Sequence, residues 1–120
     1  MVKTKAESTA ASVVTESVRD RILATARQLF YREGVRGVGV DTVVAQSGVA
    51  KTSLYRWFPS KDVLIASVVE EEAKDRWAAW DRTAERSSVL EPRERLRSHL
   101  AAIIKFVNHP KYRGCPFMNV

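Results

Sequence analysis

The segment KTSLYRW, from Lys51 to Trp57, gathers side chains that can bind a polyanion. Its cations, Lys51 and Arg56, can bond phosphate oxygens or the acceptor atoms on the edge of a guanine base. Its hydroxyls, Thr52 and Ser53, can reach the same two kinds of acceptor. Its two aromatic rings each carry a polar tip on an apolar body, which suits contact with a sugar–phosphate strand. The segment therefore has the chemistry of a nucleic-acid contact.

Ordinary helix packing is the alternative interpretation of this segment. Leu54 and Phe58 stand four residues apart, the spacing that turns both toward a core, and Tyr55 could be half-buried with only its hydroxyl exposed. Trp57 fits this interpretation poorly, because Leu54 and Phe58 already define the inner face. Periodicity alone supports DNA contact and simple packing about equally.

Three predicted helices would position the segment. The first begins at Val18 and stops at Gly34. The second, Val40–Ser47, ends at a glycine, and the third, Lys51–Phe58, ends before a proline. Two short helices joined by a tight glycine turn, after a longer first helix, make a helix-turn-helix. The positions expected to face its core are Val18, Ile22, Ala26, Leu29, Phe30, Val40, Val43, Val44, Val49, Leu54 and Phe58.

Two longer helices are predicted in the second half. Ser60 can cap the first, with Asp62 in its opening turn. The polar stretch Glu85–Glu91 separates it from the second, which begins at Pro92 and ends at the loop Asn108–Gly114. Their apolar stripes are Ile65, Val69, Ala73, Trp77 and Trp80, and then Leu96, Leu100, Ile103, Ile104 and Val107.

The expected fold class is all-α, because no strand alternation and no repeat occurs. A three-helix, homeodomain-like helix-turn-helix domain at residues 18–62 is followed by the long helices of residues 63–120. Residues 1–17 are rich in Ser, Thr and Ala without an apolar period, which predicts a disordered arm. Lys3 and Lys5 in this arm could touch a phosphate backbone.

Positive charge is densest around the candidate contacts. The net charge is +6, and residues 18–62 hold eight Lys and Arg against four Asp and Glu. This excess favours a polyanion, with nucleic acid before an acidic membrane surface. No apolar run approaches the ~18 residues of a membrane span, and no secretory signal is visible. The single cysteine, Cys115, excludes an intrachain disulfide framework and fits a cytoplasmic protein.

Residues 47–64 closely resemble the signature of the TetR (tetracycline-repressor) family. They read SGVAKTSLYRWFPSKDVL, and the family's typical run is GVxxxTLYxxFxxKxxL. The preceding run, ILATARQLFYREGVRGVGVDTVVAQ, is similar to the family's first two helices, so the resemblance covers roughly Val18 to Val69. The matching positions of the signature are Gly48, Val49, Ser53, Leu54, Tyr55, Phe58, Lys61 and Leu64.

This resemblance implies a homodimeric bacterial transcription regulator that binds a palindromic operator in double-stranded DNA. Such regulators are usually repressors released by a small-molecule effector held in a helical C-terminal domain. Residues at the start of the reading helix would carry sequence preference, and the two aromatic residues would position it. The predicted DNA-binding residues are Thr42, Lys51, Thr52, Ser53, Tyr55, Arg56, Trp57 and Lys61.

Two positions depart from the family pattern. The family usually has Thr or Ser near the start of its second helix, where this chain has Val38 and Gly39. One phosphate contact is then lost, or made by Thr42 or a backbone N–H instead. The family also prefers a small alanine four residues before the turn glycine. This chain has Val44 there, so the two short helices are expected to be slightly spread.

The resemblance is looser beyond the fourth helix, although YRGCPFMNV is similar to the opening of helix six in some members. The family's dimer interface uses two late helices, which would lie beyond Val120, so we expect a truncated or partly represented protein. Core packing is the better supported interpretation of every candidate pocket residue. These candidates are Trp77, Trp80, His99, Phe106, His109, Cys115, Phe117 and Met118.

Other classes of function find less support. Two histidines and one cysteine predict no metal site, and no cofactor is indicated. No glycine-rich phosphate loop, nucleophile–base pair or paired carboxylates point to an enzyme. A small helical protein–protein interaction module is the alternative. It fits the helices of Val63–Val107 taken alone, but it leaves Lys51–Trp57 unexplained.

Overall fold

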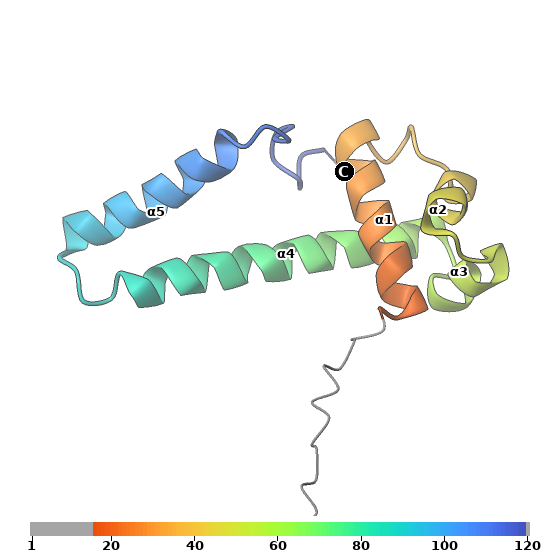
Figure 1. Ribbon diagram of the computed structural model, residues 1–120, viewed down its shortest axis with the longest axis horizontal. Coiled ribbons are helices and arrows are strands. Elements are labelled where there is room, and N and C mark those ends of the chain that lie inside the picture. The colour runs from red at the N-terminus through yellow and green to blue at the C-terminus, as the bar shows by residue number, and fades with distance from the viewer. Residues whose placement is uncertain (1–15, 120) are drawn as a thin grey trace, which may run out of the picture.

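The computed structural model describes residues 16–119, and within them it contains five helices and no strand (Figure 1). The all-α fold class is therefore confirmed. Of the arm expected at residues 1–17, only Glu16 and Ser17 lie among the described residues; Lys3 and Lys5 lie outside them. The helices are α1 (Val18–Glu33), α2 (Val40–Ser47), α3 (Lys51–Trp57), α4 (Lys61–Arg86) and α5 (Pro92–Val107).

Local sequence chemistry sets most of the helix ends. The Ser17 side chain accepts a hydrogen bond from the Asp20 amide and caps α1. The expected cap at Ser60 is confirmed, because its side chain accepts from the Val63 amide at 3.2 Å. Gly34 ends α1 with a positive φ of 77°.

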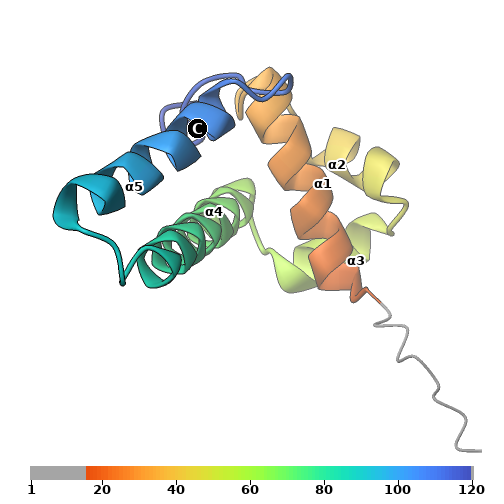
Figure 2. The ribbon, with the colours of Figure 1, turned by 60° about the vertical axis from the view of Figure 1, so that its left-hand side comes forward.

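The helices α1, α2 and α3 gather around the beginning of α4 (Figure 2), and one apolar core joins them. It extends past residue 62, the expected end of the helix-turn-helix domain, because Leu64 and Val68 of α4 belong to it. The buried residues are Ile22, Leu23, Ala26, Leu29, Phe30, Val38, Val43, Leu54, Phe58, Leu64 and Val68.

The inner face of α4 differs from the expected one. The buried apolar positions are Leu64 and Val68, each one residue before the predicted Ile65 and Val69. Ile65 packs against the core, and Val69 is half-buried. Both pairs have the same spacing of four, so periodicity cannot choose between adjacent rows. Val18 is also 41% exposed rather than inward, because it opens α1 at the edge of the core.

The long helix α4 leads away from this core, and α5 runs back beside it (Figures 1 and 2). With 26 residues, α4 is about 39 Å long. The predicted stripe on α5 exists as a sequence pattern, but its residues are 44–61% exposed. Nothing among residues 16–119 covers that stripe, so α5 contributes no buried residue. The exposed members are Leu96, Leu100, Ile103, Ile104 and Val107.

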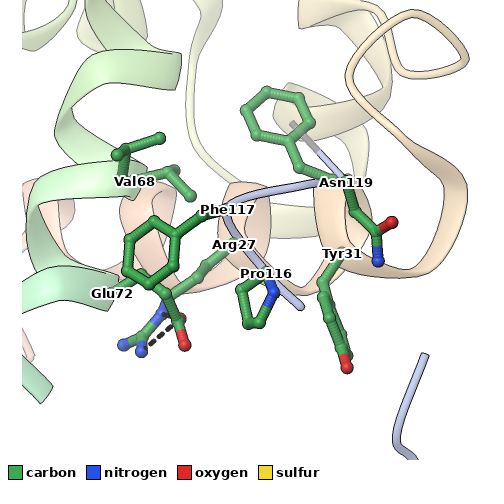
Figure 3. A pocket seen from close by; sticks show the side chains of 9 residues that line it. Arg27, Tyr31, Val68, Glu72, Pro116, Phe117 and Asn119 are labelled. Atoms are coloured by element: carbon green, nitrogen blue, oxygen red, sulfur yellow. Dashed lines mark hydrogen bonds and ion pairs between the residues drawn. The ribbon is translucent and has the colours of Figure 1, made fainter. Parts of the chain in front are cut away.

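The chain after α5 returns to α1. The Tyr31 hydroxyl accepts a hydrogen bond from the Arg113 amide at 2.7 Å and donates one to the Gly114 carbonyl at 3.0 Å. Pro116 and Phe117 then lie against the junction of α1 and α4, where they line a small cavity (Figure 3). Residues 113–117 are thus held against α1 by two hydrogen bonds and by packing.

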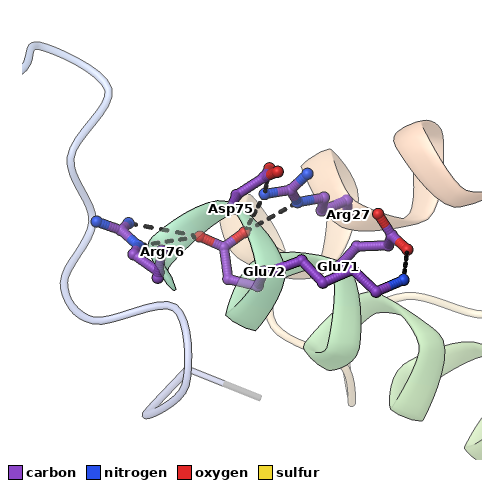
Figure 4. A network of polar contacts seen from close by, with 6 residues as sticks. Arg27, Glu71, Glu72, Asp75 and Arg76 are labelled. Atoms are coloured by element: carbon purple, nitrogen blue, oxygen red, sulfur yellow. Dashed lines mark hydrogen bonds and ion pairs between the residues drawn. The ribbon is translucent and has the colours of Figure 1, made fainter. Parts of the chain in front are cut away.

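A polar network also ties α1 to α4 (Figure 4). The Arg27 guanidinium donates to Glu72 at 2.7 Å and lies 2.6 Å from Asp75, and Arg76 lies 3.4 Å from the other oxygen of Glu72. Partial burial favours a lower pKa for Arg27, but its bonds to Glu72 and Asp75 outweigh this and raise that pKa. The network therefore adds polar contacts between α1 and α4 to the apolar core that the two helices share. No helix in the described part of the chain is long and apolar enough to cross a bilayer.

Phe30→Ala should lower the free energy of unfolding by roughly 3–5 kcal/mol, because it removes a buried aromatic ring from the core of α1. Urea denaturation followed by circular dichroism would measure this loss. Phe117→Ala is the matched control, since that ring is substantially exposed, and its loss should be clearly smaller. A loss below about 1 kcal/mol for Phe30→Ala would show that the ring is not packed in the core.

Gly39→Ser should raise the free energy of unfolding by about 0.5–1 kcal/mol. Gly39 is the N-cap of α2 and has no side chain to bond the first-turn amides, although its backbone is extended like that of Ser60. A β-carbon placed there meets nothing within 4 Å. Gly39→Ala is the control, because it adds the β-carbon without the hydroxyl. Equal stability of the two variants would exclude a capping bond.

Candidate nucleic-acid interface

The helix α3 is held by two buried side chains. Leu54 is 0% and Phe58 1% exposed, so the expected inward pair is confirmed. Successive residues of a helix are rotated by about 100°, which places Arg56 opposite this pair, with Thr52 and Ser53 on either side of it. The polar residues of the segment therefore form the outward face of α3.

The two aromatic residues lie on the edges of this outward face. By the same rotation, Tyr55 and Trp57 flank the outward residues on opposite sides. Tyr55 is 43% and Trp57 49% exposed, so neither ring is a core residue. The packing interpretation is wrong for both, because the core of α3 is already filled by its two inward residues.

The turn between α2 and α3 depends on Gly48. Its φ of 68° lies in the left-handed region, where a side chain would be strained, and its amide donates to the Val44 carbonyl at 3.1 Å.

The structure also shows where the residues that depart from the family pattern lie. Val38 is fully buried in the core, and Val44 packs against it. Gly39 leaves α2 without a side-chain cap.

Lys51 is directed toward the start of α2 rather than outward. Its ammonium lies 2.8 Å from Asp41 Oδ1, which brings the first residue of α3 near the first turn of α2, where half-buried Thr42 also lies. The hydrogen bond and the charge of Asp41 raise the pKa of Lys51 above its usual value. The ammonium therefore stays charged but is already engaged.

Lys61 reaches the loop between α1 and α2. Its ammonium donates to the carbonyl of Val35, the residue before exposed Arg36. A lysine ammonium has three donors, so this bond leaves two for another acceptor. Lys61 therefore combines a structural bond with remaining capacity to bind an anion.

Half of the eight cations in residues 18–62 are engaged by carboxylates. Arg19, Arg27, Arg32 and Lys51 each lie within 4.0 Å of an acidic side chain. No such pair forms for the other four among residues 16–119, and they remain available to an external anion. These four are Arg21, Arg36, Arg56 and Lys61.

Sequence reasoning missed two residues of this region. Arg36 adds an exposed cation directly after Val35, whose carbonyl Lys61 bonds, and its only sequence signal is a lone arginine in a glycine-rich loop. Asp41 pairs with Lys51 across the turn. No sequence rule singles out that pair, because a separation of ten residues has no meaning until the turn geometry is known.

A second concave region lies between α4 and α5. It has a volume of about 770 Å³. Trp80 stacks on His99 with ring centroids 4.0 Å apart, and the Arg76 guanidinium lies 3.6 Å from the centroid of Phe106. Its lining includes five of the eight candidate pocket residues, namely Trp77, Trp80, His99, Phe106 and Phe117.

The expectation of core packing is wrong for much of this second region. Trp77 is 67% exposed, and Trp80 and Phe117 are also exposed, because no other described segment packs over the groove. His109, Cys115 and Met118 do not line it. The groove joins an apolar aromatic floor to the basic side chains of Arg82, Arg86 and Lys105.

Comparison with known proteins gives consistent matches. The family model for bacterial regulatory proteins of the tetR family matches residues 22–68. The HTH-type transcriptional activator FasR of Mycolicibacterium smegmatis is 31% identical over 91 residues, which are 76% of this chain and 41% of that protein. The uncharacterized HTH-type transcriptional regulator Rv1255c of Mycobacterium tuberculosis is 29% identical over 93 residues, 78% of this chain and 45% of that protein.

A solved structure shows the same arrangement of helices. The crystal structure of SCO4454, a TetR-family transcriptional regulator from Streptomyces coelicolor, matches with a TM-score of 0.78 and 30% identity over 86% of this chain and 53% of that one. The chain thus spans about half the length of the relatives it matches. The matched residues coincide with the shared core of α1 to α4, and the chain belongs to the tetR family of bacterial regulatory proteins.

Proposed function

We propose that this chain carries the DNA-binding part of a sequence-specific transcription regulator, and that α3 enters the major groove. The observation that carries the proposal is the outward face of α3, where Thr52, Ser53 and Arg56 project while Leu54 and Phe58 hold the helix to the core. An α-helix fits the major groove, where each base pair presents a distinct set of donors and acceptors. Hydroxyl and guanidinium groups are suited to these acceptors.

The remaining contacts position α3 on the phosphate backbone. In the proposed complex, Tyr55 and Trp57 lie against the sugar–phosphate strands at the two edges of the groove. Lys61, with two free donors, binds a phosphate near the α1–α2 loop, and Arg36, the residue after Val35 in that loop, binds another. Thr42, in the first turn of α2, supplies a further hydroxyl. These contacts fix the register of the helix but carry little sequence information.

Regulation by a small molecule is the second part of the proposal. The groove between α4 and α5 offers an aromatic floor with a few polar groups, which is the usual character of a small-molecule site. We propose a cytoplasmic homodimer that binds a palindromic operator as a repressor and is released by an effector. One relative, FasR, is named an activator, so proteins similar to this one include both a named activator and regulators whose names give no direction.

A protein–protein interaction module without DNA binding is the second candidate function. The exposed apolar stripe on α5 favours it, since contiguous apolar surface often marks a protein interface. The two candidates differ in one measurement, a gel shift with competitor DNA. An interaction module should bind no duplex even at low salt, whereas a regulator should bind random duplex weakly and its operator tightly.

Thr52→Val should narrow the affinity gap between operator and random duplex by about 1 kcal/mol, because it removes an exposed hydroxyl without changing the shape of the side chain. Trp57→Ala should weaken both complexes alike, since in the proposed complex its ring contacts only the sugar–phosphate backbone of the DNA. The operator would be obtained by selection from a pool of random duplexes, and both affinities measured by fluorescence anisotropy at one salt concentration. The assignment of roles fails if Trp57→Ala abolishes the preference while Thr52→Val leaves it intact.

Lys61→Gln should reduce the slope of log affinity against log salt by about one, as expected for the loss of one phosphate contact. Glutamine can still donate to the Val35 carbonyl, so the loop contact is retained while the charge is removed. Lys74→Gln is the control, because Lys74 lies on the same helix about 20 Å further along, beyond the range of screened charge. Equal slopes for Lys61→Gln and the unmodified protein would exclude Lys61 from the phosphate contacts.

A further inference from the structure

The ion pair between Asp41 and Lys51 links the starts of α2 and α3. The two charged atoms are 2.8 Å apart, and the side chains are 82% and 54% exposed, respectively. An ion pair with this exposure contributes little to folding stability, because water screens it. A carboxylate beside the reading helix nevertheless weakens DNA binding, because it repels the phosphates that this surface would approach. Its presence there requires an explanation other than the stability of the pair.

A purely structural explanation is available and can be separated from a functional one. Asp41 is the second residue of α2, where a negative charge interacts favourably with the helix dipole. Asp62 is the second residue of α4 and has the same relation to its helix, but no cation pairs with it among residues 16–119. Asp62 therefore provides the dipole contribution without the contact to Lys51.

The two kinds of acceptor on DNA act differently on a paired lysine. A phosphate is an anion, so it repels Asp41 and must displace the carboxylate to gain the full charge of Lys51. The acceptor atoms of a guanine edge carry no net charge. Lysine has three donors, and its ammonium can bond Asp41 and such an acceptor at once. The pair is therefore compatible with base contact and unfavourable for phosphate contact.

We propose that Asp41 is a specificity-determining residue, which withholds Lys51 from phosphates and so weakens binding to DNA that is not the operator. The inference rests on the proposed function, since it requires that α3 lies against DNA. A lysine without such a partner reaches many phosphates through its flexible side chain and adds sequence-independent affinity. Asp41 restricts Lys51 to acceptors that tolerate a neighbouring carboxylate.

Asp41→Asn tests this inference on the full chain. It should tighten binding to random duplex by about 3- to 5-fold at low salt. The slope of log affinity against log salt concentration should become steeper by about one. The gain in affinity for random duplex over the unmodified protein should then fall roughly 4-fold between about 50 and 200 mM salt. Binding to the selected operator should tighten less, so specificity decreases. Asp62→Asn removes the same charge from the same helix position and should leave the salt slope unchanged.

A double-mutant cycle identifies Lys51 as the group through which Asp41 acts. In a Lys51→Gln background, Asp41→Asn should change random-duplex affinity no more than Asp62→Asn does. Additive effects of Lys51→Gln and Asp41→Asn would overturn the inference, because Asp41 would then act through its own charge alone. An Asp41→Asn variant that behaves like Asp62→Asn in the unmodified background would overturn it as well.

Failure of the proposed function would give a different result. If the unmodified protein and all variants bound no duplex even at low salt, the DNA-binding proposal itself would fail, and this inference with it. If the unmodified protein binds duplex and loses the interaction with increasing salt, the DNA-binding proposal stands. The cycle then decides on Asp41 alone. Circular dichroism of each variant checks that α2 and α3 remain folded.

Discussion

The position of α3 depends entirely on the core beneath it. A helix of seven residues is far below the ~12–15 residues at which an isolated helix becomes marginally stable in water. Burying Leu54 and Phe58 contributes roughly 1.5–3 kcal/mol each, and this tertiary packing holds the helix in place. The Arg19 guanidinium also lies 5.7 Å from the centre of the Phe58 ring. Every side chain that α3 presents outward is therefore placed by residues of other helices.

Features that depend on local chemistry could be predicted from the sequence. The caps at Ser60 and Gly48, the proline that follows α3 and the inward pair of α3 each depend on a few neighbouring residues, and the structure contains all of them. The prediction of the inner face of α4 was wrong by one residue, because the pairs Leu64–Val68 and Ile65–Val69 have the same helical spacing. Only the direction of the neighbouring helices selects between them, and that direction is a property of the whole fold.

Contacts between distant segments could not be predicted from the sequence in the same way. The bond from Lys61 to the Val35 carbonyl joins residues 26 apart, and Lys51 meets Asp41 only because the glycine turn folds α3 back toward α2. These contacts change the character of the candidate site. The sequence offers Lys51 and Lys61 as free cations, but each already makes a contact within the protein. Arg36 and Arg56 are exposed and form no ion pair among residues 16–119.

The return of the chain to α1 has a mechanical consequence for the groove between α4 and α5. The turn at residues 87–91 joins α4 and α5 at one end, and near the other end the Arg76 guanidinium lies against the Phe106 ring. The segment that follows α5 is in turn bonded to α1 by the two hydrogen bonds of the Tyr31 hydroxyl, each contributing about 0.5–1.5 kcal/mol. The helix pair is thus a closed frame with α1 as one of its sides. The groove and the core that holds α3 thus share one support, because α1 carries both Tyr31 and the core residues Ala26 and Phe30.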